Sequence, residues 1–196
     1  MAHRSEAELE VERRQIVAAQ RDRAAFAPLY ERYVDQIFGY VYIMTRNREQ
    51  AEDVTAATFA RAIEELPRFQ WRGVPYSAWL YRVAANLVAR ERRRPASLEL
   101  KIDAAVEMLG PSDVAERNSR AAVIREAVSQ LPAHQRQAVV LRFSGGLRNR
   151  EIADIMGRSE GAVKLLTHRA MTSLRNRLGA PLPADRTTAA HREVEL

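Results

Sequence analysis

An apolar residue recurs at alternating steps of three and one between residues 26 and 42, and this pattern limits the possible folds more than any other feature. The positions are Phe26, Leu29, Tyr30, Tyr33, Val34, Ile37, Phe38, Val41 and Tyr42. Such spacing places all of them on one stripe of an α-helix. No segment shows the alternation of apolar and polar residues that is typical of a half-buried strand. The sequence therefore predicts an all-α fold.

Two further helices follow in the first half of the chain. One is predicted over about residues 49–66 and ends at Pro67, because proline disrupts a continuing helix. Another is predicted to begin with Ser77 as its N-terminal cap and to stop at Pro95. Together with the first helix they predict one compact helical unit.

The segment from residue 95 to residue 118 differs in character, since it holds five acidic and two basic side chains together with two prolines. We interpret it as a flexible acidic linker. Helical spacing resumes at Ser119, and the apolar side of that helix is expected to hold Val123, Ile124, Val128 and Leu131. The sequence thus predicts two small helical domains joined by a linker. The expected parts are an N-terminal extension (1–25), a first domain (26–94), the linker (95–118), a second domain (119–178) and a short tail (179–196).

Composition narrows the function. Only Lys101 and Lys164 among the 31 basic residues are lysines, and the net charge is +6, with a pI near 10.1. Arginine suits phosphates and base edges, so nucleic acid is a candidate partner, with ordinary surface charge as the alternative. The absence of cysteine excludes disulfides, thiol catalysis and thiolate metal sites. The charged N-terminus and the lack of any apolar stretch of about 20 residues predict a cytoplasmic protein without membrane insertion.

Residues 150–166, REIADIMGRSEGAVKLL, have the spacing of two helices that cross through a tight turn. Small Ala153 stands at the expected crossing, Gly157 at the turn, and Ser159 where it can cap the second helix. The side chains expected to be buried in the second helix are those of Val163, Leu166, Ala170 and Leu174. Residues 142–178 also hold eight basic and three acidic side chains. The C-terminal domain is therefore predicted to be a helix-turn-helix whose opposite face enters the major groove of DNA.

A second basic segment spans residues 67–94, which hold seven arginines and one glutamate, whereas residues 26–66 hold seven acidic and four basic side chains. One helical stripe of the basic segment carries Arg82, Asn86, Arg90 and Arg93. Aromatic residues are interleaved with the arginines: Trp71, Tyr76, Trp79 and Tyr81. Stacking rings and arginines suit single-stranded nucleic acid, and packing in the core is the alternative for the rings. The acidic stretch is expected to face a different partner.

Three segments in this order resemble the extracytoplasmic-function (ECF) sigma factors of bacteria. They are AEDVTAATFARA (residues 51–62), RGVPYSAWLYRVAANLVARERRR (residues 72–94) and the helix-turn-helix. The resemblance implies that residues 26–94 are similar to sigma region 2 and that the second domain is similar to region 4. It implies a protein that binds core RNA polymerase, through its largest and second-largest subunits, and directs initiation at specific promoters. An anti-sigma factor is a further partner that the resemblance implies.

The resemblance also assigns roles to residues of this chain. Docking on core polymerase is expected to involve Glu52, Asp53, Thr55 and Phe59. Capture of the melted −10 element is expected to involve Arg72, Arg82, Asn86, Arg90 and Arg93. Recognition of the −35 element is expected to involve Arg158, Ser159, Lys164, Leu165, His168 and Arg169. Many relatives have Ser-Arg where this chain has Leu165-Leu166, so Leu165 is open to two interpretations: contact with a thymine methyl group or cover by a regulator.

Two other functions are alternatives to this one: a stand-alone regulator and an enzyme. A stand-alone helix-turn-helix regulator would explain the second domain but not the aromatic and basic segment of the first. An enzyme is not expected, because the four histidines are scattered and neither a phosphate-binding glycine loop nor a metal-ligand spacing occurs. No cofactor and no metal site are predicted.

Overall fold

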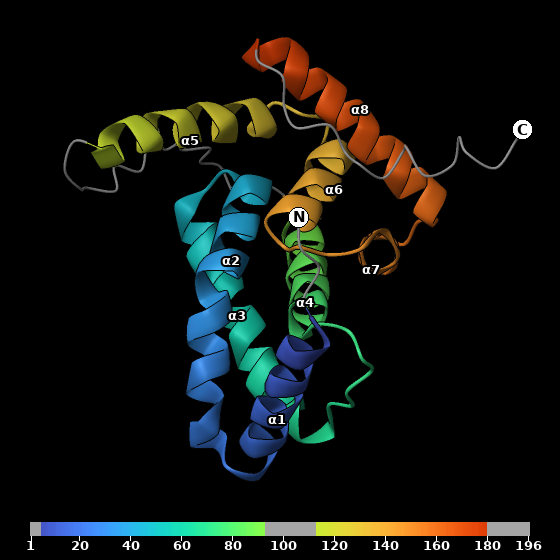
Figure 1. The fold of residues 1–196 in the computed structure, drawn as a ribbon. Coiled ribbons are helices and arrows are strands. Elements are labelled where there is room, and N and C mark those ends of the chain that lie inside the picture. Colours follow the sequence, from blue (N-terminus) through green and yellow to red (C-terminus); the bar gives the residue numbers. More distant parts are fainter. Residues whose placement is uncertain (1–4, 93–112, 180–196) are drawn as a thin grey trace, which may run out of the picture.

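The computed structural model describes residues 5–92 and 113–179, and Figure 1 shows them as a set of packed α-helices. Two 3-10 turns, η1 (Arg23–Phe26) and η2 (Leu66–Arg68), stand among the helices. The helices in chain order are α1 (Glu6–Arg21), α2 (Ala27–Thr45), α3 (Arg48–Glu65), α4 (Tyr76–Glu91), α5 (Asp113–Ser129), α6 (Ala133–Phe143), α7 (Asn149–Met156) and α8 (Glu160–Leu178). No strand occurs in these two ranges. The predicted all-α fold is confirmed.

The first helical unit is built from α2, α3 and α4, which all pack against one another (Figure 1). The stripe predicted from residue 26 onward forms its buried side, since Leu29, Tyr33 and Ile37 are fully buried. The helix over residues 49–66 is present as α3, and Pro67 falls in the 3-10 turn that follows it. The helical period therefore predicted the positions of α2 and α3 correctly, because each of these helices buries one stripe of apolar residues against its neighbours.

Helix α1 belongs to the first unit although the sequence predicted its residues only as an extension. A capping box starts it: Ser5 accepts a hydrogen bond from the Glu8 amide, and the Glu8 carboxylate accepts one from the Ser5 amide. Its inner side buries Ile16 and Ala19, which join the core of the unit. Its apolar positions do not form a clear stripe in the sequence, because charged residues occupy seven of its 16 positions.

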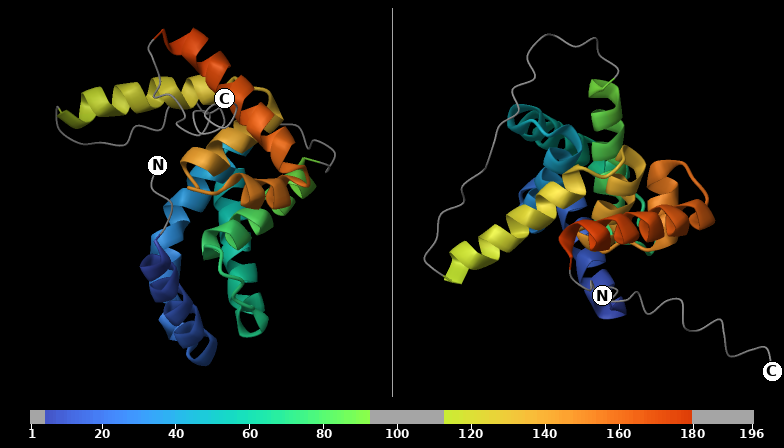
Figure 2. Two further views of the ribbon diagram at one scale, coloured as in Figure 1. Left: turned by 45° about the vertical axis from the view of Figure 1, so that its right-hand side comes forward. Right: turned by 90° about the horizontal axis from the view of Figure 1, so that it is seen from above.

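The second helical unit consists of α5 to α8, with α8 packed across α6 and α7. Helix α5 begins at Asp113, six residues before the predicted start, and residues 95–112 of the predicted linker lie outside the described residues. The predicted apolar side of this helix is only partly covered, since Val128 and Leu131 are buried but Val123 and Ile124 are 55% and 47% exposed. The physical reason is visible in Figures 1 and 2, in which α5 extends away from the other helices.

The two units pack against each other, and one core runs through both. Tyr40 of α2 and Tyr81 of α4 meet edge to face, with ring centroids 5.3 Å apart. From the second unit, the Gln137 amide donates a hydrogen bond of 3.1 Å to the Tyr40 hydroxyl, and Gly145 lies directly against the Tyr81 ring. We call these four residues the junction.

Candidate nucleic-acid interface

The predicted helix-turn-helix is formed by α7, a tight turn and α8. Gly157 ends α7 with φ 62°, a left-handed conformation that glycine adopts without strain. The Arg158 amide donates back to the Ala153 carbonyl at 3.0 Å. Ser159 caps α8, since its hydroxyl oxygen accepts a hydrogen bond of 3.2 Å from the Ala162 amide. The helix-turn-helix and its capping residue are therefore confirmed.

One side of α8 is free of protein contacts that would bury it. All six residues predicted for −35 recognition are exposed: Arg158, Ser159, Lys164, Leu165, His168 and Arg169. Val163, Ala170 and Leu174 are buried as predicted, but Leu166 is only half-buried and Thr167 takes its place inside. Position 167 fits because four residues from 163 return to the same side of a helix. The exposed side thus combines cations, an imidazole and one apolar side chain.

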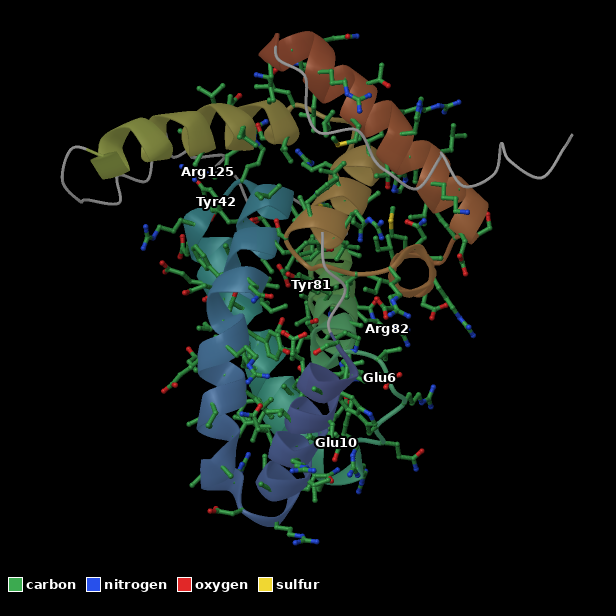
Figure 3. The ribbon with its side chains drawn as sticks, viewed as in Figure 1. Glu6, Glu10, Tyr42, Tyr81, Arg82 and Arg125 are labelled. Atoms are coloured by element: carbon green, nitrogen blue, oxygen red, sulfur yellow. The ribbon has the colours of Figure 1, made fainter. Side chains whose placement is uncertain are left out.

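The basic side of α4 carries three of the residues predicted for −10 capture. Arg82, Asn86 and Arg90 are exposed and recur every four residues, so they share one side of the helix. Arg72 is exposed in the loop before α4, and Arg93 lies outside the described residues. Figure 3 shows Arg82 pointing from α4 towards the second unit.

An open hollow separates this side of α4 from α7. Its lining comes from Arg72, Arg82 and Asn86 of the first unit and from residues 154–157 of the second. The Arg82 guanidinium lies 4.0 Å from the Asp154 carboxylate, with both side chains largely in solvent. The −10 residues therefore face α7 in this arrangement.

The four aromatic residues of the basic segment divide between the two alternatives. Tyr76 and Tyr81 are fully buried, so core packing is the correct interpretation for them, whereas Trp71 and Trp79 are half-buried. Phe69, Tyr76 and Trp79 form one cluster, in which the Tyr76 and Trp79 rings stack with centroids 5.5 Å apart. Burial raises the pKa of Tyr76 above its usual value, with nearby Glu65, Glu12 and Tyr33 acting in the same direction. These rings build the support beneath the surface rather than the surface itself.

The predicted polymerase-docking residues divide into two layers on α3. Glu52 and Asp53 are exposed, and Glu52 accepts a hydrogen bond of 2.8 Å from Arg48. Thr55 and Phe59 are buried, so in this structure they lie beneath the acidic surface and not on it. Phe59 instead packs edge to face against Tyr30, whose ring is 44% exposed. Tyr30 belongs to the apolar stripe predicted over residues 26–42, but the structure places it at the surface.

Two polar residues of α1 contact the loop that carries Arg72, and neither was anticipated. Buried Glu12 accepts a hydrogen bond of 3.1 Å from the Tyr76 amide at the start of α4. Gln20 donates to the carbonyls of Leu66 and Phe69. Ser77 was predicted to cap α4, but it is buried in the first turn and its hydroxyl makes no hydrogen bond with a described residue. The Glu12 carboxylate, 64 positions earlier in the sequence, caps the start of α4 instead. No local sequence pattern indicates this contact.

The described residues hold neither a metal-ligand cluster nor a helix that could span a membrane. Within residues 5–92 and 113–179, no three His, Asp or Glu side chains gather in a way that would hold a metal ion. In the same part of the chain, every helix is too short or too polar to cross a membrane.

Comparisons with known proteins find matches for both helical units. The family model for sigma-70 region 2 matches residues 29–97, and the model for sigma-70 region 4 matches residues 121–174. The RNA polymerase sigma factor CarQ of Myxococcus xanthus is 32% identical over 158 residues, which cover 79% of this chain and 90% of CarQ. The chain belongs to the ECF RNA polymerase sigma factors. Neither region model includes α1.

A further relative and two solved structures extend the comparison. BldN of Streptomyces coelicolor is 37% identical over 156 residues, which cover 76% of this chain but only 59% of BldN. The structure of CnrH in complex with the cytosolic domain of CnrY superposes with a TM-score of 0.62 at 23% identity, covering 87% of this chain and 99% of CnrH. The structure of the sigma factor RpoE in complex with the anti-sigma factor NepR from Bartonella quintana superposes with a TM-score of 0.64 at 20% identity. The match covers 80% of this chain and 98% of the chain in that structure. These structures show that this chain shares its fold with CnrH and RpoE.

Proposed function

We propose that this protein binds core RNA polymerase and directs promoter-specific initiation of transcription, with the polymerase carrying out the chemistry. The observation that carries the proposal is that one chain holds two separate DNA-suited surfaces. The exposed side of α8 suits the major groove of a duplex −35 element. The exposed Arg72, Arg82, Asn86 and Arg90 suit a −10 strand, since arginines follow the backbone and an asparagine amide can pair with an adenine edge.

The docking surface on core polymerase is assigned to the outer side of α3. Glu52 and Asp53 offer exposed carboxylates there, and buried Thr55 and Phe59 hold the helix in place. This acidic surface is unsuited to DNA, whose phosphates it would repel. A stand-alone regulator would need neither this surface nor a second DNA surface.

A protein inhibitor is a second proposed partner. The solved relative RpoE is in complex with an anti-sigma factor, and Leu165 of this chain exposes 49% of its surface among the cations of α8. An isolated apolar side chain on a DNA-contacting side suits either a thymine methyl group or a covering protein. A Leu165→Ala variant separates the two, because loss of −35 affinity with an unchanged inhibitor affinity assigns the residue to DNA.

The decisive experiment is transcription by purified core polymerase on genomic promoter fragments, with and without the protein. We expect protein-dependent transcripts. The double variant Arg82→Ala and Asn86→Ala should lose at least about tenfold of this activity, since each base contact is worth ~1–3 kcal/mol. Arg14→Ala serves as the matched control, because Arg14 is an exposed arginine of α1 that pairs with Glu10 and does not line the hollow beside Arg82.

The opposite outcomes are equally clear. A double variant with unchanged transcription removes the −10 assignment. A chain that yields no transcript and does not co-elute with core polymerase, yet binds duplex DNA by itself, is a stand-alone regulator.

A further inference from the structure

The loop between η2 and α4 has little backbone support of its own. Residues 70–74 make no backbone-to-backbone hydrogen bond with another described residue. Arg72, Gly73 and Val74 are exposed, and Gly73 has φ 72°. Trp71 packs against the core within the loop, so the positions of Arg72 and of the first turn of α4 depend on this packing and on what holds the two ends of the loop.

Gln20 of α1 holds the first end of the loop. Its side-chain amide donates to the Leu66 carbonyl at 3.0 Å and to the Phe69 carbonyl at 2.8 Å. Both N–H groups of the amide are thus used on the backbone where the loop leaves η2. Leu66 is fully buried, so this end is anchored in the core of the first unit.

Glu12 of α1 holds the second end. One carboxylate oxygen accepts a hydrogen bond from the Tyr33 hydroxyl, and the other accepts one from the Tyr76 amide at 3.1 Å. Tyr76 is the first residue of α4, and Pro75 before it supplies no capping side chain. A carboxylate is favourable at this place because the free amides of a helix N-terminus carry partial positive charge.

The two residues lie on the same side of one rigid helix. Eight residues separate Glu12 from Gln20, which corresponds to about 12 Å along α1. Between them the inner side of α1 buries Ile16 and Ala19 in the core. The distance between the two loop ends is thereby fixed by the length of a helix and not by the loop.

We propose that Glu12 and Gln20 are positioning residues for −10 recognition, through which α1 fixes loop 69–75 and the start of α4 against the DNA strand. The proposal rests on the proposed function of Arg72, Arg82 and Asn86. It extends that function to a helix outside the matched region 2 model, which begins at residue 29. Neither residue contacts the DNA itself, since Glu12 is buried and Gln20 is committed to the backbone.

The first test is amide hydrogen exchange on the full chain, which needs no promoter. The variant Glu12→Gln keeps the size of the side chain but replaces one acceptor oxygen with a donor. We expect the Tyr76 amide to exchange about tenfold faster, the factor that the loss of one charge-assisted hydrogen bond gives. Amides in the middle of α3 and α8 should keep their rates. A Tyr76 rate that is unchanged both in this variant and in Glu12→Ala, which removes both acceptor oxygens, overturns the role of Glu12 in holding the start of α4.

The second test measures holoenzymes on a labelled single strand that spans the −10 element of a promoter found by the transcription experiment. Gln20→Ala and Glu12→Gln should each weaken strand binding about tenfold while affinity for core polymerase stays unchanged. Val11→Ala is the matched control, because Val11 of α1 is 51% exposed and lies beside Arg32 of α2 and not beside loop 69–75. It should alter neither affinity.

The outcomes separate the possible failures. A parallel loss of core affinity and strand affinity shows a general loss of structure and overturns the positioning role. Unchanged strand affinity overturns it as well. If the wild-type chain directs no transcript, the proposed function fails and the positioning role fails with it. The Tyr76 exchange rate still reports whether Glu12 holds the start of α4.

Discussion

The two DNA-suited helices, α4 and α8, differ in what stands opposite them. The exposed side of α8 faces solvent, so Lys164, His168 and Arg169 are free to meet a duplex. The corresponding side of α4 faces α7 across a hollow, with Arg82 beside Asp154. A strand that reaches Arg82 in this arrangement shares the space with α7. Two helices with similar basic stripes therefore differ in access.

The junction produces this difference. Tyr40 and Tyr81 from the first unit meet Gln137 and Gly145 from the second, and the contact places α7 opposite α4. Its interior is aromatic and buried, whereas its rim is an exposed ion pair. We expect the buried part to carry the free energy of docking and the rim to carry little. The following predictions test that division.

Tyr81→Ala should have the largest effect. Tyr81 is fully buried and in contact with both units, so its removal leaves a cavity in the shared core. We expect the free energy of unfolding to fall by about 3–5 kcal/mol in urea titrations. Val123→Ala, at an exposed position of α5, should change it by less than about 0.5 kcal/mol. A Tyr81→Ala protein that is as stable as wild type would show that the two units do not share a core.

Gly145→Ala tests how closely the units approach. A Cβ atom at this position would lie 2.6 Å from the Leu141 carbonyl oxygen and 2.9 Å from the Tyr81 ring. Backbone cannot move aside cheaply, so we expect a loss of about 1–3 kcal/mol of unfolding free energy, measured by thermal unfolding. Gly161→Ala is the control, because its Cβ would meet open space within helix α8. The helix propensity of alanine should make that variant more stable by about 0.5–1 kcal/mol, and equal effects at both positions would contradict a close junction.

Alkaline pH should weaken the junction through Tyr40. Burial raises the pKa of Tyr40 to about 12, although the hydrogen bond from Gln137 and nearby Arg92 act in the opposite direction. A raised pKa in the folded state means that its contribution is complete below the unfolded value of about 10. It is lost as pH rises from there towards 12, by up to about 1.4 kcal/mol per pH unit. Urea titrations between pH 9 and 12 measure this slope.

The matched variant for this pH series is Tyr40→Phe. It keeps the ring against Tyr81 but has no proton to lose, so stability should fall less steeply above pH 10 than in wild type. At neutral pH it should cost about 0.5–1.5 kcal/mol, because the Gln137 amide loses its acceptor. Equal slopes for both proteins would assign the alkaline sensitivity to other groups.

The helix-turn-helix could be predicted from the sequence because its determinants are local. Ala153, Gly157 and Ser159 lie within a few residues of the backbone that they shape. The exposed side of α8 followed directly from the helical period, with only Leu166 and Thr167 exchanged. Helix α1, its hydrogen bonds to the two ends of the loop and the junction depend instead on contacts over 21 to 97 positions of sequence separation. A single sequence read by period and spacing does not contain those pairings.

The aromatic residues of α4 show that even a local pattern can leave the role of a side chain open. Their alternation with arginines suited a stacking platform, yet Tyr76 and Tyr81 are interior. Spacing alone does not distinguish a ring that stacks on bases from one that fills a core. The polar partners at positions 82, 86 and 90 were placed correctly on the exposed side, since one helical face carries them regardless of what packs behind.

Asp154→Asn should have the smallest effect and locates the limit of the junction. The carboxylate of Asp154 and the guanidinium of Arg82 are 4.0 Å apart and largely exposed, so the pair should contribute less than about 0.5 kcal/mol to stability. That small contribution should vanish in high salt. Glu65→Gln is the control, since it breaks the exposed pair with Arg61 on α3, far from α7. A loss above about 1 kcal/mol that persists in high salt would show that the rim, and not the aromatic interior, holds α7 opposite α4.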